Sequence, residues 1–384
     1  MKKLAIIGGG VMAGYMGEAC HRLGYEGHYF TMADGKVDDS MVDYFHEVNI
    51  FDKDRIVEIC REIGVDGVVP TTELSVPITA YVADKLGLLG NPVEVAENIT
   101  NKYRNRECIK HLTDLLSPKY VEATCIDDIE KSDVPYPMIL KPVCLGGKRG
   151  ISVVHNHGEL LSAFDYAVKS FRVGVKPLII AEQFLEGGVE CSVESISYKG
   201  VHTIVQITQK DSSGAPHCVE LGHHQPAPLS TDIWNKVVKG VSSGLTAIGL
   251  TNGPCHTEVK IINGEIFLIE FNARPGGDHI WYPLVELSTG FDIMAAIVQA
   301  AVGELKTIDT NSFARNYSGL YYVVKQTEYL KPIFDTCQNQ SWCKEKNFIT
   351  YEMNELIQND MEHTNYMIYA SEEGDPIAQI LNNN

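Results

Sequence analysis

One stretch of the chain, residues 255–280, concentrates the residues best suited to chemistry and reads CHTEVKIINGEIFLIEFNARPGGDHI. It contains the carboxylates Glu258 and Glu270, and Asn272 and Arg274 follow Glu270 at every second position. Neighbouring carboxylates repel each other and raise a pKa unless a cation lies between them. Oxygen ligands suit Mg²⁺, which keeps waters and takes phosphate oxygens as its other ligands. The stretch therefore predicts a metal site, and a solvated hairpin face with Glu–Lys pairs is the alternative.

The register of this hairpin decides whether the two acids meet. A two-residue loop at Asn263-Gly264 would place Glu258 opposite Ile269 and turn Glu270 to the other side. A three-residue loop, with Gly264 left-handed as a bulge, pairs Glu258 with Glu270 instead. We predict the three-residue loop. One face of the ribbon would then carry Glu258, Lys260, Ile266, Leu268, Glu270, Asn272 and Arg274.

A second group of residues is suited to holding phosphates. Lys141 ends a predicted strand in ILKPVCLGGKRGISVV, and Gly146, Gly147 and Gly150 follow it. Between two strands, such a turn is a flap whose N–H groups can cover phosphates, with the lysine as a point charge. A hairpin with a polar tip is the alternative. The next segment, IIAEQFLEGGVECSVE at 179–194, could pair its backbone with an adenine edge while a carboxylate holds ribose hydroxyls.

The start of the chain carries a weaker nucleotide signal. Gly8, Gly10 and Ala13 lie in GGGVMAG at nearly the spacing of the dinucleotide fingerprint, and Asp34 follows the second predicted strand. This pattern predicts a pyrophosphate over a helix N-terminus with an acid on the ribose. A tight strand-to-helix turn without a nucleotide is the alternative interpretation.

The elements that must position these residues follow from the hydrophobic pattern. Before about residue 92, apolar runs such as KLAII (3–7) alternate with helical spacing, which predicts a parallel, doubly wound sheet. From residue 137 onward, short alternating strands dominate and indicate antiparallel sheet. Amphipathic helices are expected at 232–250 and 291–304, and a small α+β region follows.

Composition limits the classes of function. The chain has 384 residues, which suits two or three domains, and a formal net charge of −18. That charge argues against nucleic-acid and anionic-membrane partners, which need basic patches. Ten cysteines without a CxxC pair fit reduced, partly buried residues. Without a signal-peptide core or a run of about 20 apolar residues, we expect a cytoplasmic protein.

Together these features resemble the ATP-grasp superfamily, from residue 1 to about residue 304. The resemblance implies an α/β and α+β chain with the ATP-grasp fold. An N-terminal doubly wound pre-ATP-grasp domain, which in the family usually does not bind NAD, would be followed by a small lid subdomain and an antiparallel-sheet catalytic core. The expected boundaries are 1–95 for the pre-ATP-grasp domain, 96–182 for the helical link and lid, 183–305 for the catalytic core, and 306–384 for the C-terminal region.

Carried over by motif, the resemblance also implies a role for each site residue. ATP would be bound by Lys102, Lys141, Leu145, Gly146, Gly147, Lys148, Glu182, Gln183, Phe184, Leu185 and Glu190. Two Mg²⁺ ions, or Mn²⁺, would be held by Glu258, Glu270 and Asn272. Candidate catalytic residues are Arg274, Lys260 and His279, and candidate substrate ligands are Glu73, His223 and Asp278. Histidines that are merely structural near a cleft are the alternative for His223 and His279.

Within the superfamily, residues 255–280 and ELGHHQPAPL (220–229) look most like the L-amino-acid ligases that make dipeptides. This implies an ADP-forming ligase that joins a small-molecule carboxylate to an amine, in a homodimer if it follows the family habit. The alternatives are an enzyme of purine biosynthesis or of carbamoyl-phosphate-synthase type that activates bicarbonate or formate, an NAD-dependent oxidoreductase, and a nucleotide-binding regulator without turnover.

Overall fold

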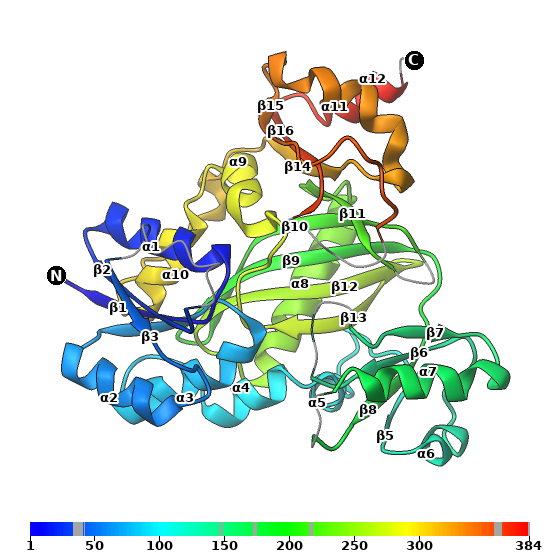
Figure 1. Ribbon diagram of the computed structural model, residues 1–384, viewed down its shortest axis with the longest axis horizontal. Coiled ribbons are helices and arrows are strands. Elements are labelled where there is room, and N and C mark those ends of the chain that lie inside the picture. The colour runs from blue at the N-terminus through cyan, green and yellow to red at the C-terminus, as the bar shows by residue number, and fades with distance from the viewer. Residues whose placement is uncertain are drawn as a thin grey trace.

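The computed structural model describes residues 1–33, 41, 43–144, 146, 149–171, 175–214, 218–356 and 363–382. Three sheets organise the chain, two of four strands and one of eight. The N-terminal sheet and the small second sheet flank the large sheet, and the C-terminal helices lie at its far end (Figure 1). Four of the residues named from the sequence, Asp34, Leu145, Gly147 and Lys148, lie outside the described residues.

The N-terminal domain is a parallel sheet with the strand order β3-β2-β1-β4. The apolar strand β1 (Lys3–Ile7) lies inside this sheet and packs against hydrophobic residues on both faces, as is typical of parallel strands. The turn after this strand is tight, because a Cβ atom at Gly8 would lie 2.5 Å from Thr71 Oγ1. The elements are β1 (Lys3–Ile7), α1 (Val11–Leu23), β2 (Glu26–Thr31), β3 (Tyr44–Glu47), α2 (Lys53–Ile63), β4 (Gly67–Pro70) and α3 (Val76–Leu86).

A helical link leads into the small second sheet, which is antiparallel with the order β5-β8-β6-β7. Two helices cover one side of it around Leu140, Leu160 and Phe164. These elements cover the segment predicted as the helical link and lid, and we refer to them as the lid. They are α4 (Val93–Ile99), α5 (Lys102–Ile109), β5 (Tyr120–Ala123), α6 (Ile126–Glu130), β6 (Met138–Pro142), β7 (Ser152–Val154), α7 (His157–Lys169) and β8 (Ile179–Gln183).

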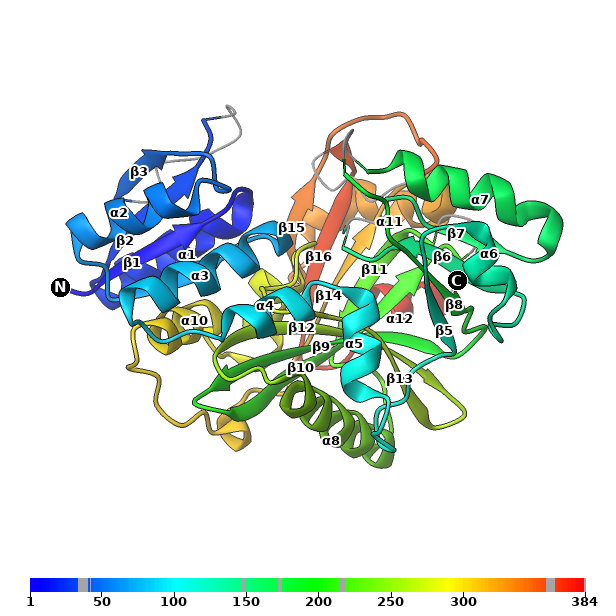
Figure 2. The same ribbon diagram turned by 90° about the horizontal axis from the view of Figure 1, so that it is seen from below.

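The large sheet has the order β13-β12-β9-β10-β11-β14-β16-β15. Helix α8 covers one face (Figure 2), where Val241 and Leu245 pack against Val259 and Leu268. The other face carries the polar residues described below. Its elements up to the C-terminal region are β9 (Val189–Tyr198), β10 (Val201–Ser212), β11 (Glu220–Gln225), α8 (Thr231–Ile248), β12 (Gly253–Ile262) and β13 (Glu265–Asn272).

The C-terminal region continues this sheet instead of forming one of its own. Strand β14 pairs with β11, and β16 pairs with both β14 and β15. A short π-helical segment (Ile280–Val285) leads from the core into this region. The remaining elements are α9 (Glu286–Thr289), α10 (Ile293–Ala301), β14 (Tyr317–Tyr322), α11 (Lys331–Thr336), β15 (Cys343–Asn347), β16 (Tyr366–Ser371) and α12 (Pro376–Asn382).

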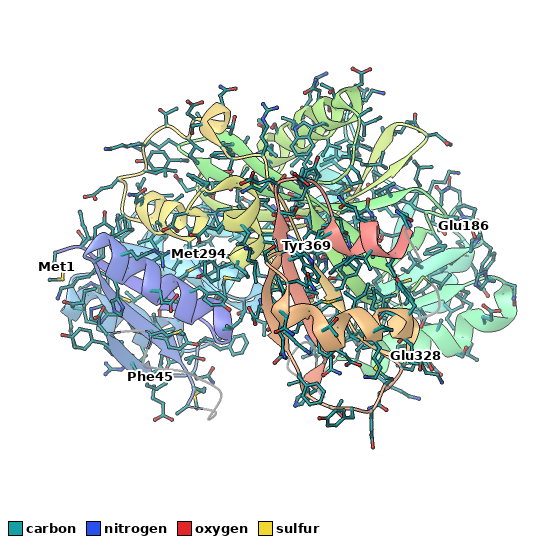
Figure 3. The ribbon with its side chains drawn as sticks, turned by 90° about the horizontal axis from the view of Figure 1, so that it is seen from above. Met1, Phe45, Glu186, Met294, Glu328 and Tyr369 are labelled. Carbon is teal, nitrogen blue, oxygen red and sulfur yellow. The ribbon has the colours of Figure 1, made fainter. Side chains whose placement is uncertain are left out.

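Helix α10 joins the N-terminal domain to the core. Met294 packs in one buried cluster with Met16 and Ala19 of α1 (Figure 3). Among the described helices, none is by itself long and apolar enough to cross a membrane. One pair, Ile280–Thr289 with Ile293–Ala301, passes that test of length and composition only together, across a bend of 113°.

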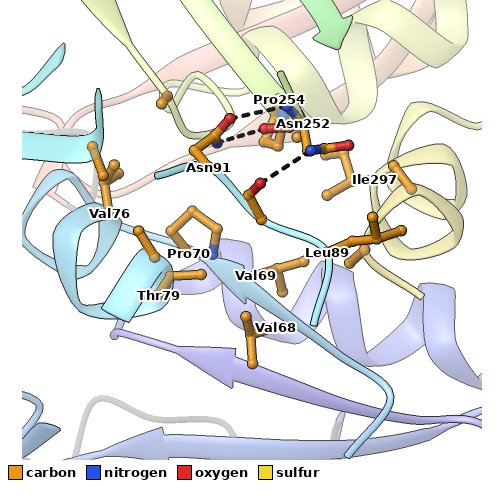
Figure 4. Close-up of a pocket in the computed structure, with 17 residues that line it drawn as sticks. Val68, Val69, Pro70, Val76, Thr79, Leu89, Asn91, Asn252, Pro254 and Ile297 are labelled. Carbon is orange, nitrogen blue, oxygen red and sulfur yellow. Dashed lines mark hydrogen bonds between the residues drawn. The ribbon is translucent and has the colours of Figure 1, made fainter. Parts of the chain in front are cut away.

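A small cavity of about 50 Å³ lies where the N-terminal sheet meets the core. Its wall is mostly apolar, with Val69 and Ile297 on opposite sides (Figure 4). Asn91 closes one edge by accepting from the backbone N–H of Asn252 at 2.9 Å and donating to its carbonyl at 2.7 Å. None of the site residues predicted from the sequence lines this cavity, which is therefore a packing feature of the domain junction.

The hairpin β12–β13 confirms the predicted pairing of Glu258 with Glu270 but corrects its cause. The loop has two residues, because Ile262 pairs with Glu265, and Asn263 and Gly264 both have positive φ as a type I′ turn requires. The extra residue is Ile269 in β13, where the register shifts opposite Glu258 and Val259.

The position of this bulge also changes which residues share a face. Ile266 and Leu268, expected beside Glu270, pack instead in the hydrophobic cluster under α8, together with Phe271. Glu270 and Asn272 lie on the opposite face because the bulge reverses the alternation. The prediction of one continuous face from Ile266 to Arg274 was wrong.

Candidate active site

A cleft of about 960 Å³ lies between the lid, the large sheet and the N-terminal domain. Most of the described residues that the sequence singled out line it. From the nucleotide and metal sets these are Lys102, Lys141, Gly146, Glu182, Gln183, Phe184, Leu185, Glu190, Glu258 and Glu270. From the catalytic and substrate sets they are Lys260, Arg274, Glu73 and Asp278. Asn272, His223 and His279 do not belong to the lining.

The centre of the cleft is a row of acids on neighbouring strands. Glu258 of β12 pairs directly with Glu270 of β13. Asn272 is buried beside them and donates from Nδ2 to Glu270 Oε1 at 3.0 Å. Oxygen donors from adjacent strands are the ligand set that Mg²⁺ takes together with phosphate and water. The arrangement therefore fits a divalent cation held by Glu258 and Glu270.

Each acid of this row is already paired with a buried lysine. Lys102 Nζ lies 2.8 Å from Glu270 Oε2, and Lys210 Nζ lies 2.7 Å from Glu258 Oε1. Burial alone would raise the pKa of both carboxyls, but Lys102 lowers the pKa of Glu270 and Lys210 holds the pKa of Glu258 well below its usual range. Both acids therefore stay ionised, as a metal ligand must.

A further group of charges lies at the lid side of the cleft. Glu182 is 1% exposed and lies between Arg106, whose Nε is 2.5 Å from Oε1, and Lys141, whose Nζ is 2.6 Å from Oε2. Burial opposes its ionisation, yet these two cations lower the pKa of Glu182 to about 2. Glu182 thus holds the ammonium group of Lys141 where the lid faces the cleft. Nearby, Lys260 Nζ lies over the Phe184 ring, 5.8 Å from its centroid.

A second acidic cluster lies next to the first, on the other side of Lys210. Potential ligand atoms of Glu220, His223 and Asp278 all lie within 4.8 Å of one another. Lys210 Nζ is 2.8 Å from Glu220 Oε1, so this lysine joins both clusters. Burial, and then the charge of Glu220, raises the pKa of Asp278 to about 7. Burial also lowers the pKa of His223 to about 3, so its imidazole is neutral.

Two of the predicted residues have neighbours that the sequence did not indicate. His279 has φ 61° and lies against Tyr366 of the C-terminal region, with ring centroids 4.8 Å apart. Glu73, from the N-terminal domain, reaches the lid: a Cβ atom at Gly146 would lie 2.3 Å from Glu73 Oε2. The N-terminal domain and the lid therefore close over the same cleft.

Sequence reasoning missed several residues of the site. Lys210 lies within β10, and a lysine inside a strand otherwise rich in Ile, Val and Thr was the available signal. Glu220 is the first residue of β11, whose sequence ELGHHQ gives no such contrast. Arg106, fully buried beside Glu182, had no local signal, because an arginine four positions after Lys102 is common on helix surfaces. His256 and Glu194 were also overlooked and are treated below.

Comparison with known proteins identifies the class. Residues 134–281 match the sequence model of the ATP-grasp domain. This match spans β6, β7, α7 and β8 of the lid and the hairpin with Glu258 and Glu270, and the sheets have the arrangement predicted for that fold. The chain therefore contains an ATP-grasp domain, and the predicted fold class is confirmed.

Two of the similar proteins are ligases by name. Alanine–anticapsin ligase of Bacillus subtilis is 27% identical over 245 residues, which cover 58% of this chain and 51% of the relative. The chain thus spans about half the length of that relative. The solved L-amino acid ligase of Bacillus licheniformis has a TM-score of 0.82 and 25% identity, covering 97% of this chain and 94% of that one. Formate-dependent phosphoribosylglycinamide formyltransferase of Prochlorococcus marinus is 24% identical over 286 residues, covering 71% of this chain and 70% of the relative.

Proposed function

We propose that this protein is an ADP-forming ligase that phosphorylates the carboxylate of an amino acid with MgATP and couples the acyl phosphate to an amine. The observation that carries the proposal is the pair Glu258 and Glu270, matched across two strands in the main cleft and each neutralised by its own lysine. The similarity to an L-amino acid ligase over nearly the whole chain favours amino acids as substrates.

The donor set fits a magnesium–nucleotide complex. Glu258 and Glu270, with Asn272 beside them, would hold Mg²⁺, and Mn²⁺ has the same ligand preference. When bound, the cation neutralises charge on the transferred phosphoryl group. The lid residues would contact the nucleotide, with the backbone of Gln183 and Leu185 against adenine and Glu190 near the ribose.

In the first step, a carboxylate oxygen of the substrate attacks the γ-phosphorus, and the bond from that phosphorus to ADP breaks. Lys102 and Lys141 neutralise the phosphate oxygens, and Arg274 stabilises the charge that develops on the phosphoryl group. Each ammonium group has three donors, so Lys102 and Lys141 can contact phosphate while they keep their contacts with Glu270 and Glu182. The lid, which meets Glu73 at Gly146, excludes water that would hydrolyse the acyl phosphate.

In the second step, the amine attacks the acyl carbon, phosphate leaves, and the nitrogen loses a proton. Asp278 and Glu220 line the same cleft as Arg274 and suit the ammonium group of an amino acid. Asp278, with its pKa of about 7, can hold a proton while the site is empty and release it when a cation enters. Lys260, His223 and His279 stay candidates for proton transfer.

A second candidate function rests on the formyltransferase relative, which would make the activated acid formate or bicarbonate. The paired acid Glu220 and Asp278 favours amino acids over these substrates, because formate and bicarbonate carry no ammonium group. The two functions differ in which small molecule releases ADP.

The experiment is a screen for ADP and phosphate release with Mg²⁺ and ATP over pairs of amino acids, with formate and bicarbonate as separate conditions. We expect release only when an amino acid is present, together with a coupled product of the summed mass less one water. Release with formate or bicarbonate alone would favour the second function. ATP binding without turnover on any substrate would contradict both.

A further inference from the structure

A second row of polar residues lies across the face of the large sheet that carries Glu258 and Glu270. It is two residues away from these acids along β12. His256 of β12 pairs with Glu194 of β9 on one side and with Asn272 of β13 on the other. The next row on that face is Ser192, Glu258 and Glu270. Because side chains two residues apart share a face, His256 stands directly beside Glu258.

The imidazole of His256 is held at both nitrogens. Nδ1 lies 2.9 Å from Glu194 Oε2, and Nε2 lies 3.3 Å from Glu258 Oε1. Glu194 is fully buried, and Ser192 donates to its other oxygen at 2.6 Å. A carboxylate buried among hydroxyls is fixed in place, so the chain Ser192, Glu194, His256 and Glu258 is one connected polar network.

The turn that follows Arg274 packs closely against the His256 ring. A Cβ atom at Gly276 would lie 2.5 Å from His256 Nδ1 and 2.7 Å from Trp281 Cδ1. Only a residue without a side chain lets the backbone approach the ring this closely. His256 is 4% exposed, so it has no room to rotate toward solvent.

The network leaves Glu258 with one oxygen for a ligand. Oε1 is contacted by both Lys210, at 2.7 Å, and His256. Among the described residues these contacts involve only Oε1, which leaves Oε2 for a cation. Groups that orient a metal ligand in this way commonly change metal affinity by about 10- to 100-fold when they are removed.

We propose that His256, locked by Glu194, is a positioning residue that orients Glu258 for the divalent cation. This inference rests on the proposed function, because it assumes that Glu258 is a metal ligand. His256 lines the cleft, but in this proposal it acts through Glu258 and not on the nucleotide or the substrate. Residues with this role were not among the site residues predicted from the sequence.

The test measures binding of Mn²⁺ to the full chain in the presence of saturating ADP, by the electron paramagnetic resonance signal of free Mn²⁺. We expect His256→Leu to weaken Mn²⁺ binding by about 10- to 100-fold. Affinity for ADP without metal, measured by calorimetry, should stay unchanged, because the network touches only the metal ligand. His256→Gln keeps a donor toward Glu258 but loses the link to Glu194, so its loss of Mn²⁺ affinity should be smaller.

Thr257→Val is the matched control, since Thr257 is equally buried and adjacent on β12 but faces away from the network. Mn²⁺ affinity of the His256 variants equal to that of Thr257→Val would overturn the inference, and so would an equal loss of metal-free ADP affinity. If His256→Leu does not fold, His256→Gln decides by the same criteria. Mn²⁺ binding that is absent from the unaltered chain would overturn the proposed function and this inference together.

Discussion

Two acidic clusters share one cleft and differ in how their charge is balanced. Glu258 and Glu270 each have a lysine within 2.8 Å, and the pKa of each carboxyl lies below its usual value. In the adjacent second cluster, Glu220 shares Lys210 with Glu258, and the pKa of Asp278 rises to about 7. The first cluster stays fully ionised and suits a divalent metal ion. In the second cluster Asp278 holds a proton, and this cluster suits a positively charged group that can displace the proton.

The strongest test of this difference is to neutralise one acid of the first cluster. Glu270→Gln keeps the shape of the side chain but removes the charge that faces Lys102. A bound metal ion contributes several kcal/mol to stabilising transition-state charge, so we expect ADP release to fall at least roughly 10³-fold. Glu265→Gln, the same change at the exposed start of β13, should leave the rate unaltered. ADP release by Glu270→Gln at the unaltered rate would remove the metal assignment.

The lysine common to both clusters gives the next largest effect. Lys210→Met leaves Glu220 and Glu258 without the cation they share, and breaking a buried ion pair costs about 3 to 5 kcal/mol. We therefore expect the free energy of unfolding in urea to fall by that amount. Lys306→Met, at an exposed position, is the control. Equal unfolding free energies for the two variants would mean that Lys210 does not balance these acids.

The smallest predicted effect is on the pH dependence of stability, which tests the difference between the two clusters. The folded-state pKa of Asp278, about 7, lies above its ordinary value of 3.8. Its contribution to stability is therefore complete below about pH 4 and is lost as the pH rises through about 7. Asp278→Asn stays neutral, so from pH 6 to 8 its melting temperature should fall by less than that of the unaltered chain.

Burial is the main cause of this raised pKa; Glu220 raises it further, Lys210 and Arg274 lower it, and all three stay in place in the Asp278→Asn variant. A difference in melting temperature that does not change between pH 6 and 8 would show that Asp278 has already lost its proton at the lower pH. The second cluster would then resemble the first, and the contrast between them would disappear.

The two strands and the Asn-Gly turn of this hairpin were predictable, because alternation and turn residues are local signals. The pairing of Glu258 with Glu270 was predicted correctly, but its cause was not local. Asn-Gly favours a two-residue loop, which by itself separates the acids, and the bulge at Ile269 that restores the pairing depends on how β13 packs against β12. The outcome was correct although the mechanism assigned to the loop was wrong.

The parts of the fold that escaped prediction depend on long-range contacts. Strand β3 has only four residues, and its weak pattern did not distinguish it from a loop. Nothing local in β14 to β16 indicates that they extend the large sheet, since that depends on β11 offering a free edge. Lys210 was missed for a related reason: its partners lie on two other strands, β11 and β12, and only the packing of the sheet brings them to it.

Strand β14 pairs with β11, so the C-terminal region is attached directly to the strand at the proposed substrate-binding part of the cleft. His223 pairs with Leu320 and His224 with Gly319, so each rung of the ladder links a residue near the cleft to one outside it. Deleting the outer strands would strip β11 of its hydrogen-bonding neighbour and leave an open strand edge. Loss of activity in such a truncated chain would thus report a distorted β11 as readily as a missing pocket wall, and point substitutions are the cleaner probe of this region.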